Sequence, residues 1–222
     1  AQAEQLEEIA ASLVRGTEAE VRIAIDEVYP YDYLARALSA LSRAYPNTRV
    51  QLQETVLSGG PELLMTGEVD LLIAPEVPQG FLGEPIMQAQ FIAVAHPAHA
   101  LHKLGRAVTL PDLVSQRQIV LRDSASRRRV DAGWLGAEQR WTVSHVATSV
   151  DMVCRGMGFA WLPASRVLPL IERGDLLELP LEQGSRRFST LYLTYAEQDR
   201  AGPVTCHLAT LLAEESRHYP VT

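Results

Sequence analysis

The feature that most constrains the fold of this chain is the alternation of short apolar strands with helical segments in its first third. Residues 21–25 (VRIAI) have the composition of a strand, and residues 33–45 carry leucines at helical spacing. Residues 50–54 alternate as a strand, and residues 58–67 indicate a short helix that ends at a glycine. Residues 69–74 (VDLLIA) are almost wholly apolar, as in a strand buried within a parallel sheet. This order predicts an α/β layer with right-handed crossovers.

The rest of the chain repeats the alternation as a second unit of similar size. Apolar runs bounded by turn residues predict its strands. A helix is expected to start near Ser124 or Ser126 and to run to residue 132. The other predicted strands are 91–95, 118–121, 141–143, 159–162, 176–179 and 191–196, and the other predicted helical segments are 110–113, 148–156 and 203–219.

Composition and charge limit the classes to which the chain can belong. The 222 residues are 47% hydrophobic and 21% charged, which is typical of a globular protein and excludes collagen-like, coiled-coil and disordered chains. The formal net charge is −7. Because a surface this negative repels phosphate, we expect that this chain alone does not bind nucleic acid.

Cysteine use and the first residues bear on the compartment. Cys154 and Cys206 form neither a zinc-binding spacing nor a disulfide framework, which favours a reducing compartment. No apolar run approaches the ~20 residues needed to span a bilayer. Residues 1–16 lack the charged and apolar regions of a signal peptide. We therefore expect a cytoplasmic protein that does not interact with a membrane.

Residues 1–16 also carry apolar side chains at helical spacing among glutamates, up to a glycine at position 16. We expect this segment to be the end of a longer helix. The alternative is a small N-terminal helix that packs on the body of the protein.

Signals for catalysis or metal binding are weak. The sequence contains no GxGxxG, P-loop, GxSxG or HExxH motif. His96, His99 and His102 are spaced three apart, which is one possible metal-binding pattern. Pro97 lies between the first two and argues against a shared helical face, so a solvated loop is favoured. We predict no catalytic residue, no metal site and no cofactor.

Five segments together resemble a known family. Residues 141–163 (WTVSHVATSVDMVCRGMGFAWLP) are similar to the lVaaGlGialLP signature of the effector-binding domain of LysR-type transcriptional regulators. Residues 45–50 (YPNTRV), 67–71 (GEVDL), 95–101 and 110–113 match further motifs of this family in order and spacing. Because the motifs agree in register over nearly the whole chain, the resemblance is specific.

A narrower similarity concerns three short stretches. Asp26 after its apolar strand, residues 54–59 (ETVLSG) and residues 122–124 (RDS) resemble a subgroup of these regulators with D..fP, EEvLSG and RDSSR motifs. The subgroup does not name a ligand.

The resemblance implies a fold and a domain organisation. It implies an α/β protein with two Rossmann-like subdomains, in a type 2 periplasmic-binding-protein-like fold with a hinge and a cleft between the lobes. Residues 1–16 would be the end of a linker helix. Residues 17–90 and 190–222 would form subdomain I, and residues 91–189 would form subdomain II.

The resemblance also implies a function without catalysis. A small polar, anionic or aromatic effector would bind between the lobes and alter the geometry of a homodimer or homotetramer. Promoter DNA would be bound only by a winged helix-turn-helix on the N-terminal side. A solute-binding protein of a transporter is the alternative, and an enzyme on the same scaffold is a second one.

Four loops would border the cleft, namely residues 26–29, 57–60, 122–126 and 145–148. Each precedes a predicted helix N-terminus, where free N–H groups favour anionic or oxygen-rich ligands. Family members often have Ser or Thr in the first two loops, whereas Val28 and Leu57 stand here, which argues against a simple carboxylate pocket. The expected ligand-binding residues are Asp26, Val28, Tyr29, Leu57, Ser58, Gly59, Arg122, Asp123, Ser124 and Thr148.

Several of these residues have an equally plausible structural role. Asp26 could bind an amine or pair with Arg122, or it could accept N–H groups of its own loop. Ser58 is favoured as a helix cap over a ligand donor. Arg122 suits a carboxylate, or else pairs with Asp123 or Asp151.

Aromatic residues and one cysteine leave further alternatives open. Either the aromatic side chains wall an aromatic ligand or, as is commoner, they pack in the core. Cys154 could be a redox sensor, but burial is favoured because no partner cysteine is evident. The aromatic residues concerned are Tyr29, Tyr31, Tyr33, Trp141 and Trp161.

Overall fold

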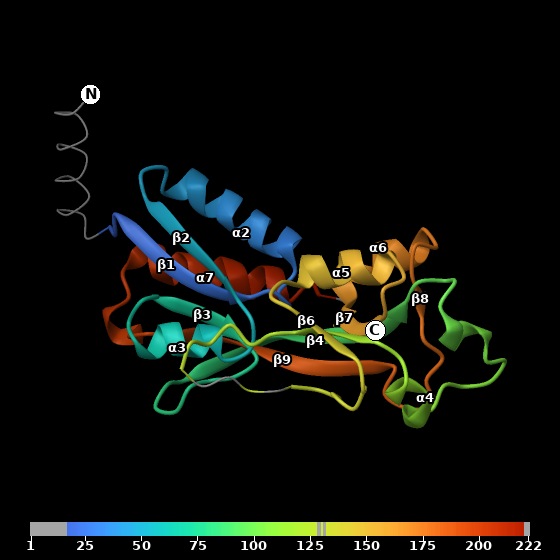
Figure 1. Cartoon of the computed structure of the whole chain (residues 1–222). Helices are drawn as coiled ribbons and strands as arrows, with labels where there is room; N and C mark the ends of the chain where they lie inside the picture. Colours follow the sequence, from blue (N-terminus) through green and yellow to red (C-terminus); the bar gives the residue numbers. More distant parts are fainter. Residues whose placement is uncertain (1–16, 128–129, 131, 220–222) are drawn as a thin grey trace. The chain divides into compact units, whose positions relative to one another are not determined.

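A computed structural model describes residues 17–127, 130 and 132–219 of the chain. The helix predicted over residues 1–16 lies outside the described residues. The chain divides into two compact units. The first contains the described residues up to 87 and from 190 onward, and the second contains residues 88–189. Two long strands, β4 (Gly83–Ala95) and β9 (Arg186–Tyr195), contribute residues to both units (Figure 1).

The strands of the first unit follow the order β2-β1-β3-β9. β1 (Glu20–Asp26) pairs in parallel with β2 (Arg49–Thr55) and with β3 (Leu71–Ala74), whereas β9 runs antiparallel to β3. The register places Asp26 opposite Thr55. Because β1 and β2 are parallel and end together, the loops that follow them leave the same edge of the sheet.

Three helices and one short turn are the other elements among the described residues of the first unit. They are α2 (Tyr31–Ala44), α3 (Gly59–Met65), α7 (Pro203–Ser216) and the 3₁₀ turn η2 (Gln198–Arg200).

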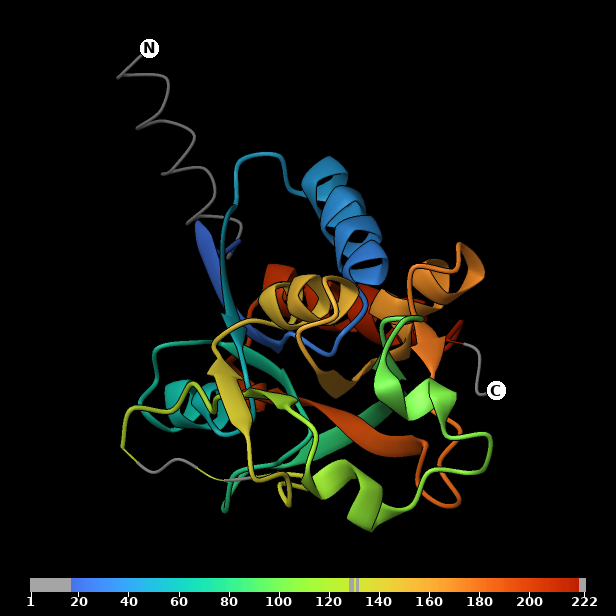
Figure 2. The same cartoon turned by 45° about the vertical axis from the view of Figure 1, so that its right-hand side comes forward.

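α2 and α7 pack against each other, as Figure 2 shows, and the Arg36 Nε donates to Glu215 Oε2 at 2.7 Å across them. α3 packs Leu64 against Ala24 and Leu72 of the sheet. Since side chains alternate along a strand, the neighbours of Ala24 and Leu72 point to the opposite face.

The strands of the second unit follow the order β4-β7-β5-β6. β7 (Phe159–Pro163) is antiparallel to β4 and parallel to β5 (Gln118–Leu121), which is parallel to β6 (Arg140–Val143). β8 (Leu177–Glu178) pairs with the end of β4. The helical elements are η1 (Ala100–Lys103), α4 (Leu110–Val114), α5 (Val146–Cys154) and α6 (Ala164–Glu172).

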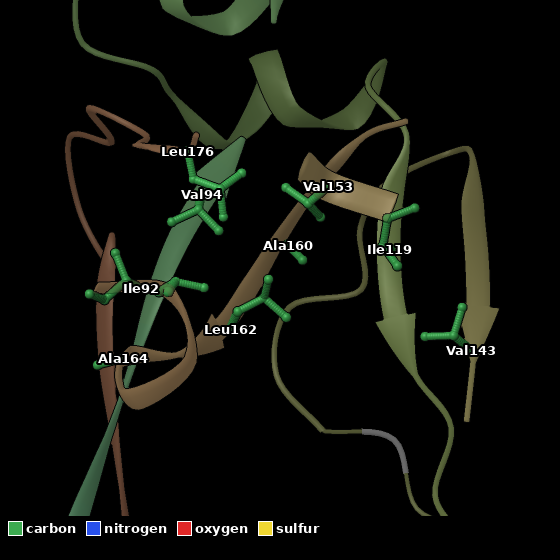
Figure 3. Close-up of a cluster of buried hydrophobic side chains, with 10 residues drawn as sticks. Ile92, Val94, Ile119, Val143, Val153, Ala160, Leu162, Ala164 and Leu176 are labelled. Atoms are coloured by element: carbon green, nitrogen blue, oxygen red, sulfur yellow. The ribbon is translucent and has the colours of Figure 1, made fainter. Parts of the chain in front are cut away.

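Two buried clusters line the strands of the second unit. One contains Ile92 and Leu162 from neighbouring strands and Val153 from α5 (Figure 3). The other contains Ala93 and Phe159, whose side chains alternate with those of the first cluster along the same strands. The unit therefore has hydrophobic side chains on both faces, as expected for a sheet covered on both sides.

The structure corrects two predictions about this unit. The helix expected to start near Ser124 or Ser126 is wrong, because residues 122–127 are not helical. Instead, the Asp123 carboxylate accepts the N–H groups of Ala125 and Val130 and holds the chain as a loop. α6 was not predicted, because prolines at its N-cap and within it, Pro163 and Pro169, obscure the helical pattern.

Candidate functional site

Asp26 joins the two predicted loops of the first unit. It ends β1 with only 2% of its surface exposed. Its Oδ1 accepts the N–H of Val28 at 3.0 Å, and its Oδ2 accepts the N–H of Leu57 at 3.0 Å. The N–H of Glu27 adds a bond to the carbonyl of Thr55 at 2.9 Å. Asp26 therefore fixes the two loops by accepting their backbone N–H groups, which is one of the roles that the sequence left open.

The second loop of the first unit holds Leu57 in an unusual conformation. Its φ is +55°, in the left-handed region, which costs about 1–2 kcal/mol for a residue with a Cβ. The bond from its N–H to Asp26 holds it there. Ser58 follows at the N-cap position of α3, but its side chain makes no capping hydrogen bond to that helix. The cap favoured from the sequence is thus not formed by the hydroxyl.

Gly59 and Gly60 begin α3 against the end of β2. A Cβ on Gly60 would lie 2.6 Å from Leu72 Cδ1 and 2.9 Å from Thr55 Oγ1, so the backbone approaches the sheet too closely for a side chain. Thr55 Oγ1 is buried and has no hydrogen-bond partner among the described residues. No pattern in the sequence singles out Thr55, because it occupies a strand position like many other residues.

Tyr29 turns away from the loop and into the packing of the first unit. Its hydroxyl donates to the carbonyl of Leu212 at 3.2 Å and lies 3.1 Å from Ser216 Oγ, both in α7. Burial raises the pKa of Tyr29 to about 12. Tyr29 therefore packs in the core, which is one of the two roles left open for the aromatic residues. Val28 beside it is half-buried.

Asp123 in the second unit repeats the role of Asp26. It is 4% exposed, and its two oxygens accept the N–H of Ala125 at 2.9 Å and of Val130 at 2.7 Å. Arg122 and Ser124, on either side of it, are exposed. Among the described residues, the Arg122 side chain pairs neither with Asp123 nor with Asp151. Its guanidinium is therefore available to a ligand.

The loop of Arg122 lies next to the start of α5. β5 and β6 are parallel and end in register at Leu121 and Val143, and the N–H of Arg122 donates to the carbonyl of Val143 at 2.8 Å. Thr148 is exposed in the first turn of α5. The unit thus brings an arginine and a helix N-terminus to one sheet edge, an arrangement that favours anionic groups.

Ser149, next to Thr148, is not among the candidates predicted from the sequence. It is 1% exposed, and within the part of the chain that the structure describes its Oγ has no hydrogen-bond partner. An isolated serine on the buried side of a helix carries no signal in a single sequence.

The remaining aromatic candidates differ in their surroundings. Trp161 packs with Trp134 and Phe159, and its indole N–H donates to the carbonyl of Gly184 at 2.9 Å. Trp141 is exposed, with the Arg117 guanidinium 4.0 Å from its ring centre. Tyr31 is exposed at the start of α2.

Cys154 and the three histidines were the candidates for redox and metal chemistry. Cys154 is half-buried, and burial raises the pKa of its thiol, which disfavours the reactive thiolate. His96 and His99 each accept an N–H two residues on. Within the described residues, no group of three or more His, Cys, Asp or Glu side chains is arranged to hold a metal ion. None of the described helices has the length and hydropathy required to cross a bilayer.

Comparison with curated proteins finds distant relatives. The chain is 27% identical over 186 residues to the uncharacterized HTH-type transcriptional regulator YeeY of Escherichia coli K12, covering 78% of this chain and 58% of that protein. It is 27% identical over 181 residues to the probable HTH-type transcriptional regulator YhaJ of the same strain, covering 79% and 59%. The chain therefore spans less than two thirds of the length of these relatives.

Comparison with solved structures shows the fold. The regulatory domain of NMB2055 (MetR), a LysR family regulator from N. meningitidis, matches with a TM-score of 0.67 at 18% identity, covering 88% of this chain and 93% of that one. The CcmR regulatory domain of Synechocystis PCC6803 in complex with 2-PG matches with a TM-score of 0.69 at 15% identity, covering 91% and 99%. Full-length LysG from Corynebacterium glutamicum with bound effector Arg matches with a TM-score of 0.69 at 17% identity, covering 97% of this chain and 73% of that one.

These matches confirm the predicted α/β class and the type 2 periplasmic-binding-protein-like fold. The LysR substrate binding domain family matches residues 15–217, which is nearly the whole chain. The chain belongs to the LysR substrate-binding domain family.

Proposed function

We propose that this chain is the effector-sensing part of a longer LysR-type transcriptional regulator. The observation that carries this proposal is the family match over residues 15–217, together with relatives that are HTH-type regulators and are longer than this chain. The DNA-binding domain would lie on the N-terminal side. The same match favours a regulator over the solute-binding protein of a transporter and over an enzyme. The usual location of this family is the cytoplasm, and we propose it here.

The effector would bind to the candidate loops of two subdomains, one of residues 17–90 and 190–222 and the other of residues 91–189. Related structures carry 2-PG in one case and Arg in another, so the fold accommodates ligands of different charge. In this chain the exposed Arg122 and the start of α5 favour an anionic effector. Ligand binding would shift the geometry of a homodimer or homotetramer.

The proposed site is narrower than the set expected from the sequence. We retain Val28, Ser58 and Gly59 from the first unit. Arg122, Ser124 and Thr148 complete the site. Asp26, Leu57 and Asp123 would shape the loops through their backbone contacts, and Tyr29 would belong to the packing around α7.

Replacing Arg122 with alanine should weaken an anionic effector about tenfold, or about 1.4 kcal/mol, because a charged hydrogen bond is lost. A thermal-shift screen of small organic acids would identify a stabilising compound, and calorimetry would then measure its affinity for the variant. Arg166→Ala is the matched control, since Arg166 is an exposed arginine on α6 of the same unit. Equal affinity for Arg122→Ala and the wild type would remove Arg122 from the site.

The chain alone should not shift duplex DNA in a gel at physiological salt. Its net charge of −7 repels phosphate. Several arginines are also held by carboxylates, as in the pairs Arg22–Asp70 at 2.6 Å and Arg106–Asp112 at 2.7 Å. A shift that weakens as salt increases would contradict the assignment of DNA binding to a separate domain.

A further inference from the structure

The helix α7 of the first unit is held at its N-terminal end by Glu18. Glu18 Oε2 accepts the N–H of Val204 at 2.9 Å, and Oε1 accepts the N–H of Thr205 at 3.1 Å. These amides lie in the first turn, where a helix has no carbonyl partners of its own. The N-cap residue is Gly202, which has no side chain to cap the helix. Glu18, far away in sequence, therefore does the capping.

Several contacts fix Glu18 in this position. Burial opposes its ionisation, but the hydrogen bonds from Val204 and Thr205 outweigh burial and hold the pKa of Glu18 below its ordinary value. The Glu18 carbonyl accepts the hydroxyl of Thr48 at 2.9 Å. A Cβ on Gly202 would overlap the Glu18 carboxylate, so only glycine leaves room for this cap. The position of Glu18 is thus fixed by several independent contacts.

The C-terminal end of α7 is held by the loop that follows β1. Tyr29 lies within hydrogen-bond distance of both the Leu212 carbonyl and Ser216 Oγ. Ser216 Oγ in turn lies 2.6 Å from the Leu212 carbonyl, which closes a buried network. Val28, directly before Tyr29, donates its N–H to Asp26. The end of α7 is therefore connected to a loop of the candidate site by two consecutive residues.

α7 between these two attachments is a single uninterrupted helix. Its 14 residues extend about 21 Å at 1.5 Å per residue. Val204, Leu208 and Leu212 are completely buried along it. A helix packed in this way moves as one body more readily than it bends, since bending would break backbone hydrogen bonds.

We propose that α7 transmits the state of the Asp26–Tyr29 loop to Glu18, beside the first described residue of the chain. Glu18 and Tyr29 are positioning residues, one at each end of the helix. The functional meaning rests on the proposed function, because the DNA-binding domain would precede residue 17. A ligand that moves the loop would then shift Glu18 through α7.

Hydrogen exchange of the 222-residue chain, followed amide by amide by NMR, tests this coupling without effector or DNA. Glu18→Gln removes one of the two acceptors at the N-terminal end, and Tyr29→Phe removes the hydroxyl at the other end. Asp70→Asn is the matched control, because it breaks the ion pair with Arg22 in the same unit but touches no residue of α7.

Each variant is expected to speed exchange by about fivefold at its own end and by at least about twofold at the far end. Glu18→Gln should affect the amides of Val28 and Leu57, and Tyr29→Phe those of Val204 and Thr205. Asp70→Asn should leave both sets unchanged. Changes confined to the mutated end, or equal changes in the control, would overturn the proposal. Either result leaves the proposed function untouched, since effector and DNA binding are measured separately.

Discussion

Replacing Asp26 with alanine should lower the free energy of unfolding by about 2–4 kcal/mol. The carboxylate is buried and accepts two backbone N–H groups, from Val28 and Leu57. Alanine would leave these two part-buried donors without their acceptors, and a buried donor without an acceptor costs about 1–3 kcal/mol. Leu57 would also lose the contact that holds its left-handed conformation.

Urea unfolding followed by far-UV circular dichroism measures this loss. Asp26→Asn is the informative control, since the amide keeps one acceptor oxygen and should give an intermediate loss. Asp32→Ala, at an exposed position in the first turn of α2, should change stability by less than about 0.5 kcal/mol. Stability of Asp26→Ala within that same margin would show that its carboxylate does not hold the two loops.

Asp26 and Asp123 show what the sequence could and could not predict about the site. Each follows a predicted apolar strand, and the structure places Asp26 at the last residue of β1 and Asp123 two residues beyond the end of β5. Their role depends on where the backbone N–H groups of the following loop point, which no side-chain pattern encodes. For the same reason the sequence could not predict where the Tyr29 side chain points. Its direction is set by α7, about 180 residues later in the chain.

The fold was more predictable than the site because buried strands leave a strong sequence pattern. β1 and β3 appeared as apolar runs, and together with the alternating pattern of β2 they predicted the βαβαβ order of the first unit. Prediction failed where a local signal conflicts with packing. α6 buries Val167 despite an internal proline, and residues 122–127 stay irregular despite two serines suited to capping a helix.

The glycines of the motif at residues 156–158 show how a family pattern follows from packing. Gly156 ends α5 with a φ of +73°, and the nearest atom to a Cβ there would be 3.8 Å away. Gly158 has no such backbone requirement, but a Cβ on it would lie 2.4 Å from the carbonyl oxygen of Arg117. The two glycines are therefore needed for different reasons, conformation at one position and space at the other.

Replacing Gly158 with alanine should lower the free energy of unfolding by about 3 kcal/mol, because the clash is with backbone. The neighbouring strands cannot move apart easily, since the N–H of Phe159 donates to the same Arg117 carbonyl at 3.0 Å and β7 pairs with β5 there. Gly156→Ala is the matched comparison and should cost only about 1 kcal/mol, the price of a positive φ with open space around it. Urea unfolding of the two variants measures both losses. A larger loss of free energy of unfolding for Gly156→Ala than for Gly158→Ala would contradict this explanation. The close approach of β7 to β5 would then not be the reason for a glycine at position 158.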